Sequence, residues 1–95
     1  MTDDSRSRMT ALALTFPTLE AAPGVDPWDP AALDTWATGG NPGSGARHAV
    51  HFLLSVWDPQ RRWKSRGLHL HAALQTWDAA HRRAWQAWAA APWWP

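Results

Sequence analysis

The sequence predicts an all-α fold: a small single domain of about four short helices with an extended or disordered N-terminal arm. Three observations support this fold class. The chain has 95 residues and a mass of 10.6 kDa, which fits one domain. Apolar residues recur with the helical period of 3.6 residues through most of the chain after residue 28. A single segment, 11–16, alternates with the period of a strand, and no second segment could pair with it.

The first helix of the domain is expected to begin at Pro30, directly after Asp29. An aspartate at the N-cap accepts hydrogen bonds from free backbone amides, and a proline at the first helical position loses none. Trp36 lies on the apolar face of this helix. The glycines at 39–40 end the helix and open a flexible loop.

The second helix has the clearest apolar face in the chain and should form the centre of the core. Ser44 is a candidate N-cap, and Asp58, followed by a proline, ends the helix. The polar side of the helix carries His48 and His51, which we expect to face solvent. The apolar positions follow the spacing i, i+3, i+4, i+7, i+8 and i+11: Ala46, Ala49, Val50, Leu53, Leu54 and Trp57.

Two further helices are expected towards the end of the chain. Thr76 or Asp78 can cap the second of them, which stops before Pro92. In that helix His81 lies on the apolar side, so we expect it to make a structural hydrogen bond. The first of the two has apolar residues at i, i+3, i+4 and i+7: Leu70, Ala73, Leu74 and Trp77.

Residues 1–27 form the predicted arm, which is flexible, acidic and rich in proline, and residues 28–95 form the helical domain. Within the arm, apolar and small residues alternate over 11–16, which fits a short strand. The chain offers this segment no partner strand. It is therefore either an extended arm lying on the domain or a strand that completes a partner's sheet.

The net charge of +1 conceals opposite charges on the two parts of the chain. Up to Gly45, six acidic residues face two arginines, a net charge of −4. After Gly45, seven basic residues face two acidic ones, a net charge of +5. Such asymmetry favours an anionic partner, but the acidic half could equally fold back and neutralise the basic half.

A basic segment surrounds one aromatic ring between residues 61 and 66. Its four cations can neutralise phosphates while Trp63 stacks on an unpaired base. The alternative is a solvated loop in which Trp63 packs into the core and the arginines pair with the acidic N-terminal half. The candidate phosphate-binding residues are Arg61, Arg62, Lys64 and Arg66.

Nine tryptophans are far more than a chain of this length usually holds. Five lie on apolar helix faces and are assigned to the core: Trp36, Trp57, Trp77, Trp85 and Trp88. The other four stand in a proline-rich link, among cations or at the end of the chain. They are candidates for an exposed, partner-binding aromatic surface: Trp28, Trp63, Trp93 and Trp94.

Several classes of function are not expected. The chain has no cysteine, which removes disulfides, thiolate metal sites and cysteine nucleophiles. No serine has a nucleophile-elbow motif around it and the domain is small for a substrate pocket, so we expect neither an enzyme with catalytic residues nor a small-molecule substrate. His48 and His51 lack a clear third ligand, so no metal site and no cofactor are expected. No apolar run is long enough for a transmembrane segment.

These observations favour a small, tryptophan-rich, non-enzymatic module that binds a protein partner or a second copy of itself. The many Ala, Arg, Pro and Gly residues are typical of a high-GC bacterial or phage genome, and the absence of cysteine suits the cytoplasm. We therefore expect a cytoplasmic accessory or inhibitory subunit of a bacterial or phage complex. The alternative is a nucleic-acid-associated factor that contacts phosphates through the basic segment 61–66.

Overall fold

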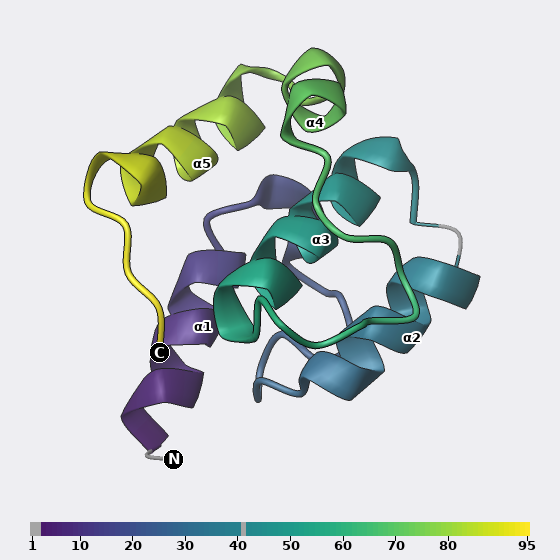
Figure 1. The fold of residues 1–95 in the computed structure, drawn as a ribbon, viewed down its shortest axis with the longest axis vertical. Coiled ribbons are helices and arrows are strands. Elements are labelled where there is room, and N and C mark those ends of the chain that lie inside the picture. Colours follow the sequence, from purple (N-terminus) through teal and green to yellow (C-terminus); the bar gives the residue numbers. More distant parts are fainter. Residues whose placement is uncertain (1–2, 41) are drawn as a thin grey trace.

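The fold is seen in a computed structural model, which describes residues 3–40 and 42–95. Within these residues the chain forms five α-helices and one short 3-10 turn, and no strand (Figure 1). The all-α, single-domain prediction is confirmed, and the four helices expected after residue 28 are α2 to α5. In chain order the elements are α1 (Asp3–Ala13), η1 (Pro17–Leu19), α2 (Pro30–Gly39), α3 (Ser44–Trp57), α4 (Leu70–Thr76) and α5 (Ala79–Ala90).

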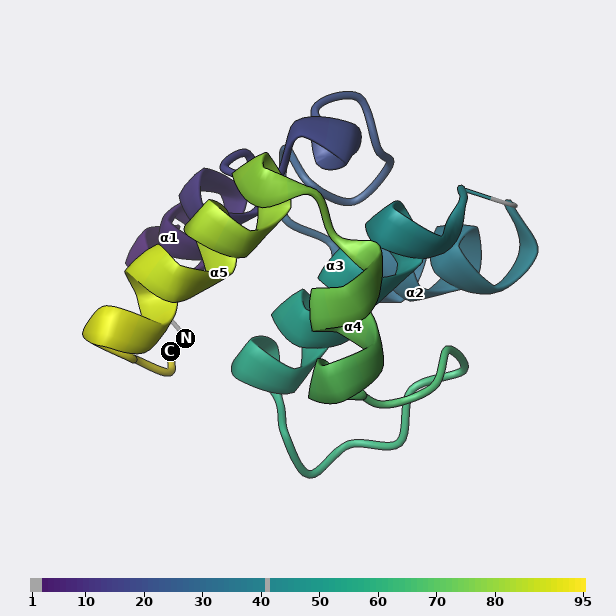
Figure 2. The ribbon, with the colours of Figure 1, turned by 90° about the horizontal axis from the view of Figure 1, so that it is seen from above.

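Helix α3 lies at the centre of the molecule, as its long apolar face predicts. It contacts α1, α2, α4 and η1, which surround it in both views of the ribbon (Figures 1 and 2). Val50 and Leu53 are fully buried on this helix. Burying a side chain of that size stabilises the fold by about 1.5–3 kcal/mol, so α3 organises the core on which the rest of the molecule packs.

The strand considered for 11–16 does not form, and that prediction is wrong. Residues 3–13 are helical instead, and α1 presents Met9, Leu12 and Ala13 to the core. Together with Phe16 these residues have the spacing i, i+3, i+4 and i+7 of a helix face. A helix satisfies its own backbone hydrogen bonds, whereas a lone strand would leave them unpaired, so the helical period prevails.

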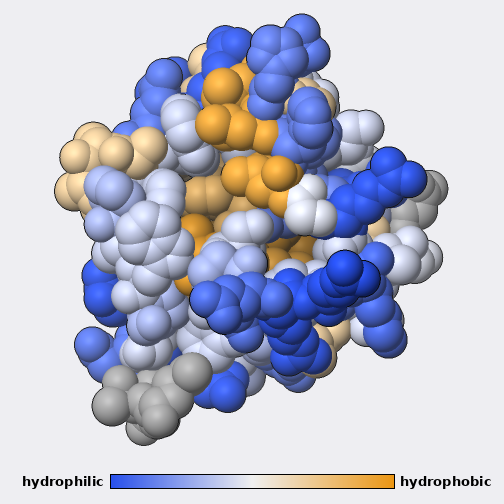
Figure 3. Space-filling model, in the orientation of Figure 1, coloured by the Kyte–Doolittle hydropathy of each residue, from blue (hydrophilic) through white to orange (hydrophobic). Residues whose placement is uncertain are grey.

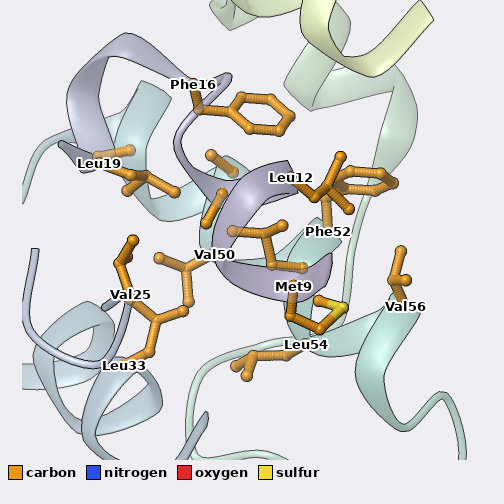
Figure 4. Packing of buried hydrophobic residues seen from close by; sticks show 14 of the residues in the cluster. Met9, Leu12, Phe16, Leu19, Val25, Leu33, Val50, Phe52, Leu54 and Val56 are labelled. Atoms are coloured by element: carbon orange, nitrogen blue, oxygen red, sulfur yellow. The ribbon is translucent and has the colours of Figure 1, made fainter. Parts of the chain in front are cut away.

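The remainder of the expected arm folds back over α3 rather than extending away from it. Leu19 and Val25 are buried in the same cluster as the α1 residues (Figure 4), and Trp28 belongs to that cluster too. Two side chains of α1 hold this return in place: Arg6 donates to the carbonyl of Trp28 at 2.8 Å, and Thr10 donates to the carbonyl of Val25. The described part of 1–27 is therefore an integral layer of the core.

The helix caps largely follow the sequence. The Asp29 carboxylate accepts from the amide of Ala32 at 3.2 Å, and the Asp78 carboxylate accepts from the amide of His81 at 2.9 Å. Ser44 differs from expectation because it is the first residue of α3. The N-cap is Gly43, which has a φ of 92° and no side-chain oxygen, so no side chain caps this helix.

Helix α5 and the tail that follows it lie on the outside of the molecule. Trp88 packs edge-on against Phe52 of α3, with ring centroids 5.1 Å apart. The tail then returns to α1 (Figures 1 and 2). There the Arg8 guanidinium lies over the Trp93 ring at 4.0 Å. None of the helices in the described residues is long and apolar enough to cross a membrane.

Candidate anion-binding site

A pocket of about 460 Å³ lies between the polar face of α3, the end of α2 and the loop that joins α3 to α4. We call it the cationic pocket. Figure 3 shows strongly hydrophilic side chains gathered over this loop. The lining residues are Ala37, Thr38, Ser44, Arg47, His48, His51, Lys64, Ser65 and Arg66.

Asp34 fixes the loop side of the pocket. This α2 residue is only 4% exposed, and its carboxylate accepts from the backbone amides of Lys64 at 2.8 Å and Ser65 at 2.7 Å. Burial alone would raise the pKa of Asp34, but the hydrogen bonds from Ser65 and Lys64 outweigh it and hold the pKa below its usual value. Asp34 therefore stays ionised and ties the loop at Lys64 and Ser65 to α2, beside Arg66.

The helix side of the pocket supplies a third cation. Arg47 donates from Nε to the carbonyl of Ala37 at 3.4 Å, close to the end of α2. Among the side chains that the structure describes, no arginine or lysine lies within 4.0 Å of a carboxylate, and the one ion pair joins His81 to Asp78. The acidic half of the chain thus does not neutralise Arg47, Lys64 or Arg66 by contact.

His51 is buried, which corrects the expectation that it faces solvent. The side chain is 6% exposed, because the loop and α2 cover the polar face of α3 at this point. Burial, and then the charges of His48 and Arg47, lower the pKa of His51 to about 4. Burial, with Arg47 and His69, also lowers the pKa of His48. Both imidazoles are therefore neutral at pH 7.

Three buried polar atoms around the cationic pocket lack a hydrogen-bond partner among the described residues. They are Nε2 of His51, Nδ1 of His48 and the hydroxyl oxygen of Ser65. Leaving such an atom unsatisfied costs about 1–3 kcal/mol. Ordered water normally relieves that cost, so the wall of the pocket holds polar groups whose hydrogen bonds the described residues do not supply.

No protein-family model, curated protein or solved structure matches this chain. Function therefore has to be argued from the chemistry of the site itself. The chemistry that the pocket presents is hydrogen-bond donation and positive charge, without a carboxylate base among its lining residues.

The predicted phosphate-binding residues divide between two hollows. Lys64 and Arg66 line the cationic pocket, whereas Arg61 and Arg62 line only a neighbouring hollow of about 340 Å³. The sequence did not single out Arg47, His51 or Asp34 for the site. The only signal in the sequence was that Arg47, His48 and His51 fall on the polar side of α3, opposite its apolar face. A helix face exposed to solvent has the same pattern.

The four tryptophans expected on the surface have different environments. Trp28 is 2% exposed and packs on Trp57 at 5.8 Å, so its assignment to an exposed surface is wrong. Trp63 and Trp93 are half-buried against the core. Trp94 is 55% exposed and meets Trp88 edge-on at 5.3 Å. Only Trp94 is broadly open to a partner.

One arrangement resembles a hydrolase relay but has a structural explanation. Nδ1 of His81 lies 2.7 Å from the Asp78 carboxylate, and Nε2 lies 2.9 Å from the Thr18 hydroxyl. Asp78 is the N-cap of α5, and the Thr18 contact ties η1 to that helix. His81 thus makes the structural hydrogen bonds expected of it. No three potential metal ligands gather anywhere in the described residues.

Proposed function

We propose that this chain is a non-enzymatic binding module for a ligand that carries phosphate-type oxyanions, held in the cationic pocket. The observation that carries the proposal is the convergence of Arg47, Lys64 and Arg66 on one cavity, with no described carboxylate within 4.0 Å of their charged groups. Unpaired cations repel one another, and an anion removes that repulsion. The proposal develops the phosphate-binding alternative and adds Arg47 to it.

The donors suit an oxyanion with several oxygens. A guanidinium offers a planar pair of N–H groups that match a phosphate or carboxylate, and Lys64 adds a compact charge. The first turn of α3 has no side-chain cap, and Ser44 at that turn lines the pocket. Helix N-termini favour anions, and the volume lies within the range of small-ligand pockets.

Calorimetric titration with pyrophosphate at low salt tests this function. We expect Arg47→Ala and Arg66→Ala each to weaken binding about tenfold, the loss of one charge-assisted contact. Arg82→Ala is the matched control, because Arg82 is exposed on α5 and lines neither hollow. An equal loss in all three variants, or no binding by the unaltered chain, would contradict the proposal.

A protein partner is the second candidate, as an accessory or inhibitory subunit of a bacterial or phage complex. The exposure of Trp94 favours it, because tryptophan is enriched in interface hot spots. Trp94→Ala should abolish any concentration-dependent association seen by sedimentation, or the capture of a host protein, while Arg66→Ala leaves it unchanged. Association that survives Trp94→Ala would rule out this surface.

A further inference from the structure

A second hollow continues the cationic pocket along the same face of α3. Ser44, His48 and His51 line the pocket, and Ser55 and Asp58, one and two turns further on, line the hollow. With a helical rise of about 1.5 Å per residue, the α3 residues that line the pocket and those that line the hollow are centred about 13 Å apart along the helix. The shared wall between them consists of Lys64, Ser65 and Arg66.

Positive charge covers both hollows. Arg61 and Arg62 add two exposed cations beside the hollow, and neither lies within 4.0 Å of a described carboxylate. Asp58 is the one acidic residue that lines the hollow, and its carboxylate accepts from the amide of Gln60 at 3.1 Å. A ligand that reaches both sites meets five cations: Arg47, Arg61, Arg62, Lys64 and Arg66.

A cation–aromatic pair stands beside the hollow. The Arg61 guanidinium lies over the Trp63 ring at 4.3 Å, and the indole N–H of Trp63 donates to the carbonyl of Asp58 at 3.4 Å. Trp63 is half-buried against the core while Arg61 is exposed, so the ring backs the guanidinium plane and steadies it. Unpaired bases stack on guanidinium planes as well as on aromatic rings.

We propose that the ligand is a single-stranded nucleic acid, with one phosphate in the cationic pocket, another in the second hollow and a base stacked over Arg61. The inference rests on the proposed function and names its ligand class. At about 3.4 Å per stacked nucleotide, a strand of about five nucleotides spans the separation between the two hollows. Stacking on Arg61 distinguishes a strand with exposed bases from a duplex or a bare polyphosphate.

Binding of fluorescein-labelled oligothymidylates of two, five and ten nucleotides, measured by fluorescence anisotropy, tests this ligand. We expect affinity to rise at least about tenfold from two to five nucleotides. From five to ten nucleotides it should rise only by the number of extra registers in which the longer strand can bind. Arg61→Ala/Arg62→Ala should weaken binding of the five-nucleotide strand about tenfold. The slope of log K against the logarithm of salt concentration should also become shallower by about 1.4, the value expected when contacts with two phosphates of a single strand are lost.

Arg82→Ala/Arg83→Ala is the matched control, since it removes the same charge from an exposed part of α5 that lines neither hollow. An abasic strand of equal length and charge should bind more weakly than the oligothymidylate, because it cannot stack. Equal affinity for the abasic strand, for polyphosphate or for a duplex would overturn the inference, as would equal losses in the two double variants.

Pyrophosphate separates this inference from the proposed function. If pyrophosphate binds and Arg47→Ala weakens it, but strand length and Arg61→Ala/Arg62→Ala have no effect, the pocket binds an oxyanion and the nucleic-acid inference fails. If Arg47→Ala changes neither pyrophosphate nor oligonucleotide binding, the proposed function itself fails.

Discussion

At the scale of single residues, His51 is a neutral imidazole buried beside cations. Its titration should make the free energy of unfolding depend on pH. The groups that face it are His48 and Arg47 on α3, Asp34 on α2 and Arg66 on the loop. All except Asp34 disfavour its protonation. Burial and the neighbouring cations therefore keep this imidazole uncharged at neutral pH.

We predict that acidification destabilises the fold between pH 6.5 and 4. The pKa of His51 is about 4 in the fold against 6.5 when unfolded, so the unfolded chain takes up the proton first. The stabilisation is complete above pH 6.5 and is lost as the pH falls towards 4, by up to about 3 kcal/mol. Urea unfolding at a series of pH values measures this slope.

His51→Gln should flatten the slope, whereas the matched change His71→Gln, at an exposed position, should preserve it. A slope unchanged in His51→Gln would show that another group carries the proton linkage.

Asp34 is predicted to position the anion site through the loop backbone. In Asp34→Asn one oxygen becomes an amide that cannot accept, so the amide of Lys64 or Ser65 loses its partner. We expect a loss of about 1–3 kcal/mol in unfolding free energy, together with weaker pyrophosphate binding. Asp29→Asn is the control, because asparagine caps a helix as well as aspartate does. Equal effects in the two variants would contradict a positioning role for Asp34.

At the scale of elements, substitutions in and next to α1 test whether the N-terminal layer stabilises the core. Met9 is fully buried, so Met9→Ala should cost about 2–5 kcal/mol of unfolding free energy. Leu14→Ala, at a residue that is 45% exposed, should cost far less. Chemical denaturation of the two variants measures the difference. Similar small losses in both would mean that α1 contributes little to the core.

Local signals in the sequence predicted four of the five helices that the described residues form. Asp29 and Asp78 act within a few residues of the helices they cap, and the apolar face of α3 repeats over about three turns, so neither signal depends on distant contacts. The residues around Leu12 fit a period of two as well as a helix, and the charged start of α1 hides its apolar stripe. Only packing on α3 resolves that ambiguity.

The site was less predictable than the fold because it depends on long-range contacts. Lys64 and Arg66 stood out as members of a charge run, and they do line the pocket. Arg47 and His51 resemble an ordinary solvated helix face until the loop held by Asp34 covers them. Trp28 was misassigned because a proline-rich sequence does not reveal that its chain returns to the core.

At the scale of the whole molecule, opposite charges are separated along the chain without ion pairs joining arginine or lysine to a carboxylate in the described residues. Stability and ligand binding should therefore respond differently to salt. Raising NaCl from about 0.05 to 0.5 M screens repulsion among the pocket cations, so the melting temperature should hold or rise. The same change should sharply weaken anion binding.

Thermal unfolding and anion titration at matched salt concentrations check this pair of expectations. A marked fall in melting temperature with salt would reveal attractive ion pairs as a main source of stability.

The contact of Arg8 with Trp93 brings together residues from opposite ends of the chain. A single stacked cation–aromatic pair contributes only about 0.5–1 kcal/mol at an exposed site. The central helices can assemble without this contact, whereas the contact depends on both α1 and α5 being in place. We therefore expect this contact to open before the central helices unfold, which makes the junction of the two chain ends a sensitive place to monitor partial unfolding.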